Sequence, residues 1–76
     1  MEEKLMEILG DINEEILTYE GTNMMADGII DSFGLISIIS QLEDEFDLEI
    51  NAEDVTVENF ANKECIIGLL KNLLAK

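Results

Sequence analysis

Residues 27–33 read DGIIDSF, and the interpretation of the whole chain depends on this stretch. It closes a long polar segment and leads into the apolar run LISII at residues 35–39. Asp31 and Ser32 are both good helix caps, because a short polar side chain can accept a hydrogen bond from a free N–H of the first turn. We therefore predict a helix that begins at Asp31 or Ser32. The Ser32 hydroxyl would then lie at the positive end of that helix, where an anion is stabilised.

The predicted helix continues to Phe46. Its apolar residues recur at steps of three and four, which indicates one buried side. This buried side consists of Leu35, Ile38, Ile39, Leu42 and Phe46. A second side, with a spacing near four, consists of Ser32, Ile36, Ser40 and Glu43. Because this side is otherwise small and polar, we expect Ile36 to lie outside the core.

Two further helices are predicted from the same periodicity. The first runs without a break from Glu3 to about Thr18. The last follows the cap residue Asn62 and ends near Leu74. The first has an apolar stripe of Leu5, Ile8, Leu9, Ile12 and Ile16. The last has a stripe of Ile66, Leu70, Leu73 and Leu74, with Ile67 and Leu69 at its margins.

The segments between the predicted helices are long. Residues 19–30 lack periodicity, and we expect Met24 and Met25 to anchor this loop in the core; the alternative is that they contact a partner. Residues 43–58 hold eight acidic and no basic residues. Residues 47–50, DLEI, alternate as a short strand would, but we interpret them as part of a connecting loop, since the chain offers no second strand to pair with them. A short helical turn from Val57 to Phe60, capped by Thr56, follows.

These elements predict an all-α fold, a small four-helix bundle of three principal helices and one short one. A chain of 76 residues makes one domain with one modest core, and we expect residues 1–76 to form a single monomeric domain. The residues that should pack together in its core are Ile38, Leu42, Phe46, Phe60, Ile66 and Leu70.

The charge of the chain restricts its partners. Four basic and 18 acidic side chains give a net charge of -14. Nucleic acids and anionic membranes attract basic surfaces, so neither is an expected partner. Complementary potential instead favours a basic patch on another protein.

Three features favour the cytoplasm. The single cysteine, Cys65, has no disulfide partner within the chain, as fits a reducing compartment. The first residues, MEEK, lack the cationic and apolar regions of a secretory signal. No apolar stretch approaches the roughly 20 residues that a membrane span needs. We expect a cytoplasmic protein without a membrane span.

The residue types in the chain argue against a catalytic site. The chain has no histidine, so a serine or cysteine lacks its usual activating base. Cys65, next to two isoleucines, is expected to be a small buried side chain. A calcium loop that starts at Asp11 has Ile16 and Thr22 where a glycine and a glutamate are needed. We therefore predict no catalytic residue and no specific metal site, and at most loose divalent binding around residues 43–58.

The stretch DGIIDSFGL, followed by a helix that ends in EDEFDLEI, resembles the acyl carrier protein family, which includes acyl, peptidyl and D-alanyl carriers. The resemblance covers nearly the whole chain and extends to the acidic exit with Ile50, the turn that ends at Phe60 and the last helix. The Asp-Ser pair is unspecific alone. Its place in a four-helix pattern of this length and acidity is the stronger signal, and it implies a bundle of the acyl-carrier type.

The resemblance implies that Ser32 carries a 4'-phosphopantetheine arm, donated from coenzyme A by a Mg²⁺-dependent phosphopantetheinyl transferase. The arm would hold cargo as a thioester, so the chain would be a non-catalytic, stand-alone carrier. Implied partners are a cargo-loading ligase or adenylating enzyme and downstream acyl- or aminoacyl-transferring enzymes. These enzymes would meet a face that includes Asp31, Phe33, Ile36 and Ser40.

The cargo stays open between fatty-acid, polyketide, nonribosomal-peptide and D-alanylation pathways. Fatty-acid carriers usually have Leu after the modified serine, whereas Phe33 and Gly34 follow Ser32 here. The lead-in DGIIDS looks more like D-alanyl or peptidyl carriers, which favours an amino acid or a specialised acyl group. The alternative function is an unmodified acidic helical adaptor, in which Ser32 is only a cap.

Overall fold

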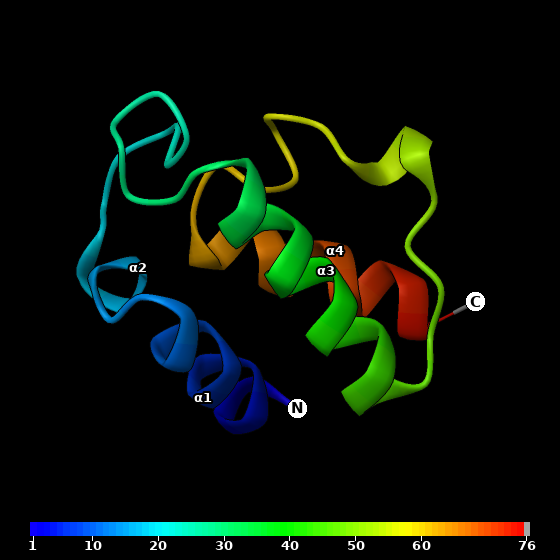
Figure 1. Ribbon diagram of the computed structural model, residues 1–76. Coiled ribbons are helices and arrows are strands. Elements are labelled where there is room, and N and C mark those ends of the chain that lie inside the picture. Colours follow the sequence, from blue (N-terminus) through cyan, green and yellow to red (C-terminus); the bar gives the residue numbers. More distant parts are fainter. Residues whose placement is uncertain (76) are drawn as a thin grey trace.

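The computed structural model describes residues 1–75, which contain four α-helices and one 3-10 helix (Figure 1). These elements are α1 (Glu2–Ile12), α2 (Glu15–Thr18), α3 (Ser32–Phe46), η1 (Ala52–Asp54) and α4 (Lys63–Leu74). No strand occurs among residues 1–75, so the predicted all-α bundle of three principal helices and one short helix is confirmed. None of the helices in this range has the length and apolarity to cross a membrane.

The predicted continuous helix from Glu3 to Thr18 is wrong, because the chain breaks at Asn13. Asn13 has an extended backbone with φ -163° and ψ 115°. Its side-chain oxygen accepts a hydrogen bond from the Glu15 N–H at 2.9 Å, so it supports the start of α2. Asparagine can hydrogen-bond to nearby backbone in place of the helical ladder, which explains a break inside an otherwise helical pattern.

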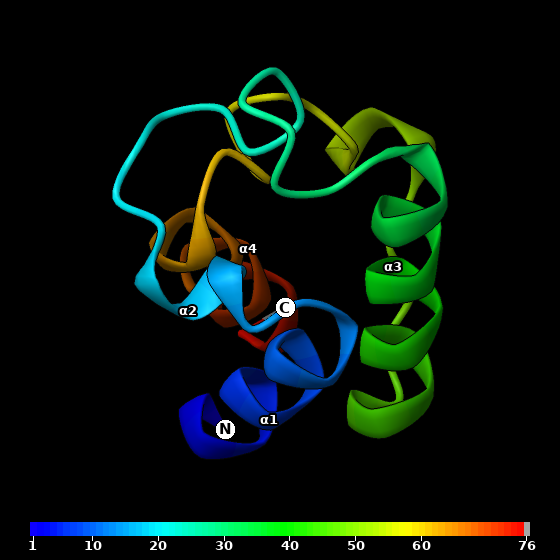
Figure 2. The same ribbon diagram turned by 60° about the vertical axis from the view of Figure 1, so that its left-hand side comes forward.

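The loop from Tyr19 to Asp31 crosses the end of the bundle at which α3 begins, and the segment before α4 passes beside it (Figure 2). Met24 anchors this loop and is fully buried. Its N–H donates to the Ala61 carbonyl at 3.1 Å, and its carbonyl accepts from the Ile29 N–H at 2.9 Å. The same expectation for Met25 is wrong, since its side chain is 39% exposed.

The connection from α3 to α4 has no strand, as predicted. It contains η1, which the sequence analysis missed, although Asn51 and Asp54 form a reciprocal capping box there. Thr56 caps the next turn as predicted, with its hydroxyl accepting from the Asn59 N–H at 3.1 Å. That segment is a single turn closed by a Phe60 N–H to Thr56 carbonyl bond, so the short fourth helix is α2 instead.

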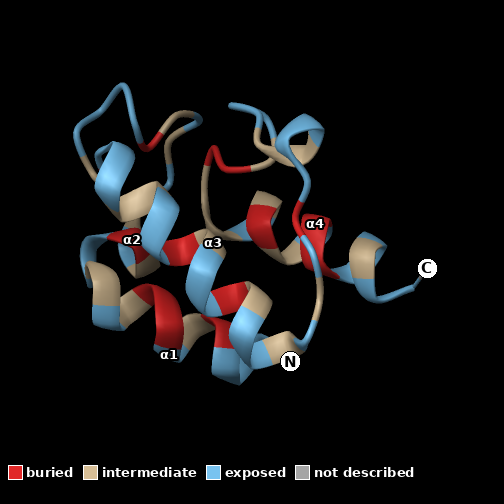
Figure 3. Ribbon diagram, turned by 45° about the vertical axis from the view of Figure 1, so that its right-hand side comes forward, coloured by how far each residue is buried: buried red, intermediate tan, exposed pale blue. Residues whose placement is uncertain are grey.

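The helices α1, α3 and α4 each contribute buried residues to the core, and these are the red segments of the ribbon in Figure 3. The predicted core is confirmed except for Phe46, which is only partly buried. On α4, Leu69 belongs to the core whereas Leu74 is exposed, so the buried side is rotated from the predicted one. Asn62 caps α4 as predicted, accepting from the Cys65 N–H at 3.0 Å. The main buried residues are Leu5, Ile8, Leu9, Ile16, Met24, Ile30, Ile38, Leu42, Phe60, Ile66, Leu69 and Leu70.

Candidate functional site

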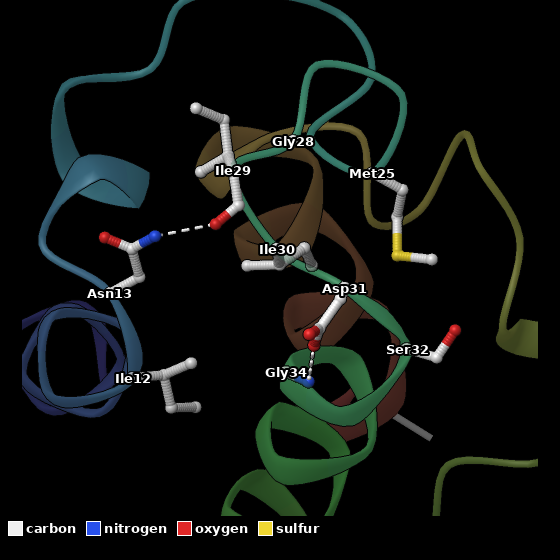
Figure 4. A pocket seen from close by; sticks show the side chains of 9 residues that line it. All are labelled: Ile12, Asn13, Met25, Gly28, Ile29, Ile30, Asp31, Ser32 and Gly34. Carbon is white, nitrogen blue, oxygen red and sulfur yellow. Dashed lines mark hydrogen bonds between the residues drawn. The ribbon is translucent and has the colours of Figure 1, made fainter.

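The start of α3 holds the Ser32 hydroxyl at the protein surface. Asp31 is the N-cap, and its carboxylate accepts from the Gly34 N–H at 2.8 Å. The Leu35 N–H donates to the Asp31 carbonyl at 3.0 Å. Ser32 is therefore the first helical residue and is exposed. Its side chain points away from Asp31 and Gly34 (Figure 4).

The electrostatics of this helix end favour an anion near Ser32. The first turn of a helix leaves N–H groups without intrahelical acceptors, and here the Ser32 and Phe33 amides have no hydrogen-bond acceptor in the described part of the chain. The helix dipole adds partial positive charge at the same place. The Asp31 carboxylate opposes this effect in part, but its capping bond to Gly34 turns one oxygen toward the backbone.

A hollow of about 490 Å³ lies on one side of Ser32, between the end of α1, the long loop and the start of α3 (Figure 4). A hydrogen bond spans it: the Asn13 side-chain N–H donates to the Ile29 carbonyl at 2.6 Å. Ile29 lies three residues before Ser32. The sequence analysis missed this contact, because nothing in a periodic pattern pairs residues that are 16 positions apart.

A second set of hydrogen bonds, centred on Tyr19, lies nearer the start of the same loop. The Tyr19 hydroxyl donates to the Asp27 carboxylate at 2.5 Å and accepts from the Asn23 N–H at 2.9 Å. The bond to Asp27, together with partial burial, raises the pKa of Tyr19 above its usual 10.0. A side chain at Gly21 would overlap the phenol ring, so the glycine makes room for this arrangement.

Comparison with known proteins indicates the family. No family model matches the chain. D-alanyl carrier proteins of Bacillus cereus strain B4264 and Bacillus anthracis strain CDC 684 are each 23% identical to it, over 93% of this chain and 92% of theirs. The chain is a distant homologue of these D-alanyl carrier proteins over nearly its full length. Carrier proteins are non-catalytic, in agreement with the prediction that the chain is not itself an enzyme.

The four residues predicted to face partner enzymes are all exposed. Phe33 is 81% exposed and Ile36 is 59% exposed, so Ile36 lies outside the core as predicted. Asp31 and Ser40 are exposed as well. Phe33, Ile36 and Ser40 follow one another at steps of three and four residues on an exposed side of α3, and Asp31 is the N-cap that precedes this helix.

Two further exposed apolar side chains lie close to this surface, and of these only Val57 had no such role among the sequence-based alternatives. Met25 and Val57 are 39% and 57% exposed. They line an apolar hollow of about 220 Å³ together with Leu35 and Phe60. Met25 also lines the hollow beside Ser32, so the two hollows adjoin. A periodic pattern places residues on helix faces but does not reveal which loop side chains meet.

Two of the lysines form ion pairs with acidic side chains. Lys4 forms ion pairs with Glu7 and Glu45 at 3.8 and 3.7 Å, and Lys71 pairs with Glu2 at 3.7 Å. Residues 5–62 contain no lysine or arginine. Within the described part of the chain, acidic or thiol side chains nowhere gather in threes close enough to hold a metal ion. Cys65 is half-buried on α4 rather than fully buried as expected.

Proposed function

We propose that Ser32 bears a covalent 4'-phosphopantetheine group and that the chain carries cargo on it. The observation that supports this most directly is the exposed Ser32 hydroxyl at the first position of α3, in a full-length homologue of carrier proteins. The phosphodiester fits this position, since the amides of Ser32 and Phe33 are free to receive it and the helix end is positive. When bound, the group supplies a thiol on which an acyl or aminoacyl group is held as a thioester.

The attachment needs an external enzyme. The Ser32 oxygen attacks the phosphorus of coenzyme A that bears pantetheine, and a new P–O bond forms. The bond from that phosphorus to adenosine 3',5'-bisphosphate breaks, and the serine proton passes to a base. Because the chain has no histidine, a Mg²⁺-dependent phosphopantetheinyl transferase provides the base.

We assign partner docking to the exposed side of α3. Phe33 and Ile36 offer apolar contact area, and Asp31 and Ser40 offer polar contacts beside it. The acidic surroundings favour partners with basic surfaces, such as a loading ligase or adenylating enzyme and the enzymes that later receive the cargo. The proposed setting is the cytoplasm, where coenzyme A is available.

An amino acid or a similarly small acyl group is the cargo we favour. The matched relatives are named D-alanyl carrier proteins. The hollow that Ser32 lines has a volume of about 490 Å³, and the adjoining apolar hollow, which Ser32 does not line, has about 220 Å³. The choice of cargo therefore rests on the relatives and not on the size of a pocket.

Intact-mass measurement tests the attachment. The unmodified protein is incubated with coenzyme A, Mg²⁺ and a broad-specificity phosphopantetheinyl transferase, and then weighed. The wild type should gain the mass of one phosphopantetheine, and Ser32→Ala should gain nothing. Ser37→Ala is the matched control, since it removes an exposed hydroxyl of α3 to which no partner contact is assigned, and it should be modified like the wild type.

The alternative function, an unmodified acidic adaptor, makes the opposite prediction. If the wild type gains no mass with several transferases, Ser32 is only part of a helix start and the adaptor is favoured. The exposed Phe33 and Ile36 would suit an adaptor equally well, so surface properties alone do not separate the two functions.

A further inference from the structure

We propose that Asn13 is a positioning residue for Ser32: by holding the Ile29 carbonyl, it keeps the first turn of α3 in the geometry that group transfer needs. This inference rests on the proposed function, because it concerns the rate at which Ser32 accepts its group. Nothing in the motif around Ser32 involves Asn13, which lies 19 residues earlier, at the break between α1 and α2.

Two capping bonds hold the amide groups at the start of α3. The Asp31 carboxylate and the Asp31 carbonyl accept from the Gly34 and Leu35 N–H groups, whereas the amides of Ser32 and Phe33 have no acceptor in the described residues. Both capping bonds depend on the backbone position of Asp31. The orientation of the Ser32 hydroxyl therefore depends on the segment that leads into Asp31.

That lead-in segment has no regular structure and is fixed by few contacts. The N–H groups of Ile29 and Ile30 both approach the Met24 carbonyl, at 2.9 and 3.4 Å, and the Ile30 side chain is buried. These contacts fix the amide side of the segment. On the carbonyl side, Ile29 accepts from Asn13 at 2.6 Å. This bond joins the lead-in segment to the α1–α2 junction, where Leu9 and Ile16 are fully buried.

Asparagine suits this position because both ends of its amide are used. The oxygen accepts from the Glu15 N–H at 2.9 Å while the nitrogen donates to Ile29 (Figure 4). Aspartate retains the oxygen that supports α2 but has no N–H, and it turns a negative charge toward the Ile29 carbonyl. Asn13→Asp therefore removes the tether selectively and keeps the helix break.

The chain offers a matched control in Asn23→Asp. Asn23 lies in the loop that contains Ile29, and its side-chain oxygen accepts from the Ala26 N–H at 3.1 Å. Its side-chain nitrogen donates to no described residue. The control therefore makes the same chemical change, and adds the same charge, without removing a donor that is in use.

The experiment measures modification kinetics and hydrogen exchange on the full chain. With coenzyme A and a phosphopantetheinyl transferase, Asn13→Asp should lower kcat at least about tenfold, since a small misplacement of a reacting atom is costly. KM for the chain should stay unchanged, because the exposed side of α3 that binds the enzyme is intact. Amide exchange at Gly34 and Leu35 should be faster than in the wild type. Asn23→Asp should match the wild type in all three.

Equal kcat values for Asn13→Asp and Asn23→Asp would overturn the inference, and so would a loss confined to KM. If Asn13→Asp does not fold, Asn13→Ser takes its place, since serine caps α2 but is too short to reach Ile29. The exchange measurement needs no transferase, so it tests the tether even if Ser32 is never modified. Unmodified wild type defeats the proposed function, whereas normal modification of Asn13→Asp defeats only the positioning role.

Discussion

The two sides of α3 both carry large apolar residues but differ in how far these residues are buried. Ile38 and Leu42 are fully buried, whereas Phe33 and Ile36 on the other side are 81% and 59% exposed. Single exposed apolar residues are common on protein surfaces. Here, however, two of them lie within one turn of an exposed serine. The difference indicates that the buried side of α3 maintains the fold and that the exposed side is available to a partner.

The buried side should account for most of the stability that α3 contributes. Leu42→Ala removes a fully buried side chain and should lower the free energy of unfolding by about 2–5 kcal/mol. Small domains have little stability to spare, so much of the population could unfold. Urea denaturation measures the change. A loss below about 1 kcal/mol would show that Leu42 is not part of a tightly packed core.

The cap at the start of α3 should have a smaller effect. Asp31→Ala removes the acceptor for the Gly34 N–H and should cost about 0.5–2 kcal/mol in the same measurement. Asp44→Ala is the control, because Asp44 is an exposed acid on the same helix without a capping role. It should change stability by less than about 0.5 kcal/mol. Equal effects of the two substitutions would mean that charge rather than capping decides the result.

Alkaline pH should disturb the loop that leads into α3, where Tyr19 bonds to Asp27, and leave the buried side of α3 unchanged. The pKa of Tyr19 is raised by its bond to Asp27, so the neutral phenol is favoured in the folded state. This contribution to stability is complete below pH 10.0 and is lost as the pH rises through the higher pKa of the folded state.

Ultraviolet absorbance follows this titration directly, because Tyr19 is the only tyrosine and the chain has no tryptophan. The phenol of Tyr19 should ionise at a higher pH in the folded protein than in the urea-unfolded protein. As the phenol ionises, amide signals of Asp27 and Gly28 should change before those of Leu42. Tyr19→Phe should lack the transition. Identical titration of folded and unfolded protein would rule out the Tyr19–Asp27 bond.

The smallest effect on stability is expected at Ile36. Ile36→Ala should change the free energy of unfolding by less than about 0.5 kcal/mol, since most of the side chain is in solvent. Binding to the transferase or to a loading enzyme should weaken, which titration calorimetry measures. Urea melts in which Ile36→Ala is as damaging as Leu42→Ala would contradict the distinction between the two sides.

The sequence predicts those parts of the fold that depend on local rules. Helix periodicity gave the extent of α3 and α4, and the caps at Asn62 and Thr56 followed from residue type. The exposure of Ile36 followed from its place off the apolar stripe. In each case, residues within one or two turns decide the outcome.

The parts that were missed depend on contacts between distant residues. Asn13 interrupts the first helix and bonds to Ile29. The Tyr19 ring lies against Gly21, and its hydroxyl bonds to Asp27. Met24 occupies the position of this loop in the core, and the neighbouring Met25 is left partly exposed. Such tertiary contacts override local propensity and cannot be seen in a periodic pattern.

Locating the added group within the chain tests the central claim most directly. Residues 5–62 contain no lysine or arginine, so a glutamate-specific protease is needed; it should release residues 21–43 from the modified protein. This peptide holds Ser32, Ser37 and Ser40. Fragmentation in a mass spectrometer should place phosphopantetheine on Ser32 alone. Its presence on Ser37 or Ser40, or its absence from the peptide, would contradict the account.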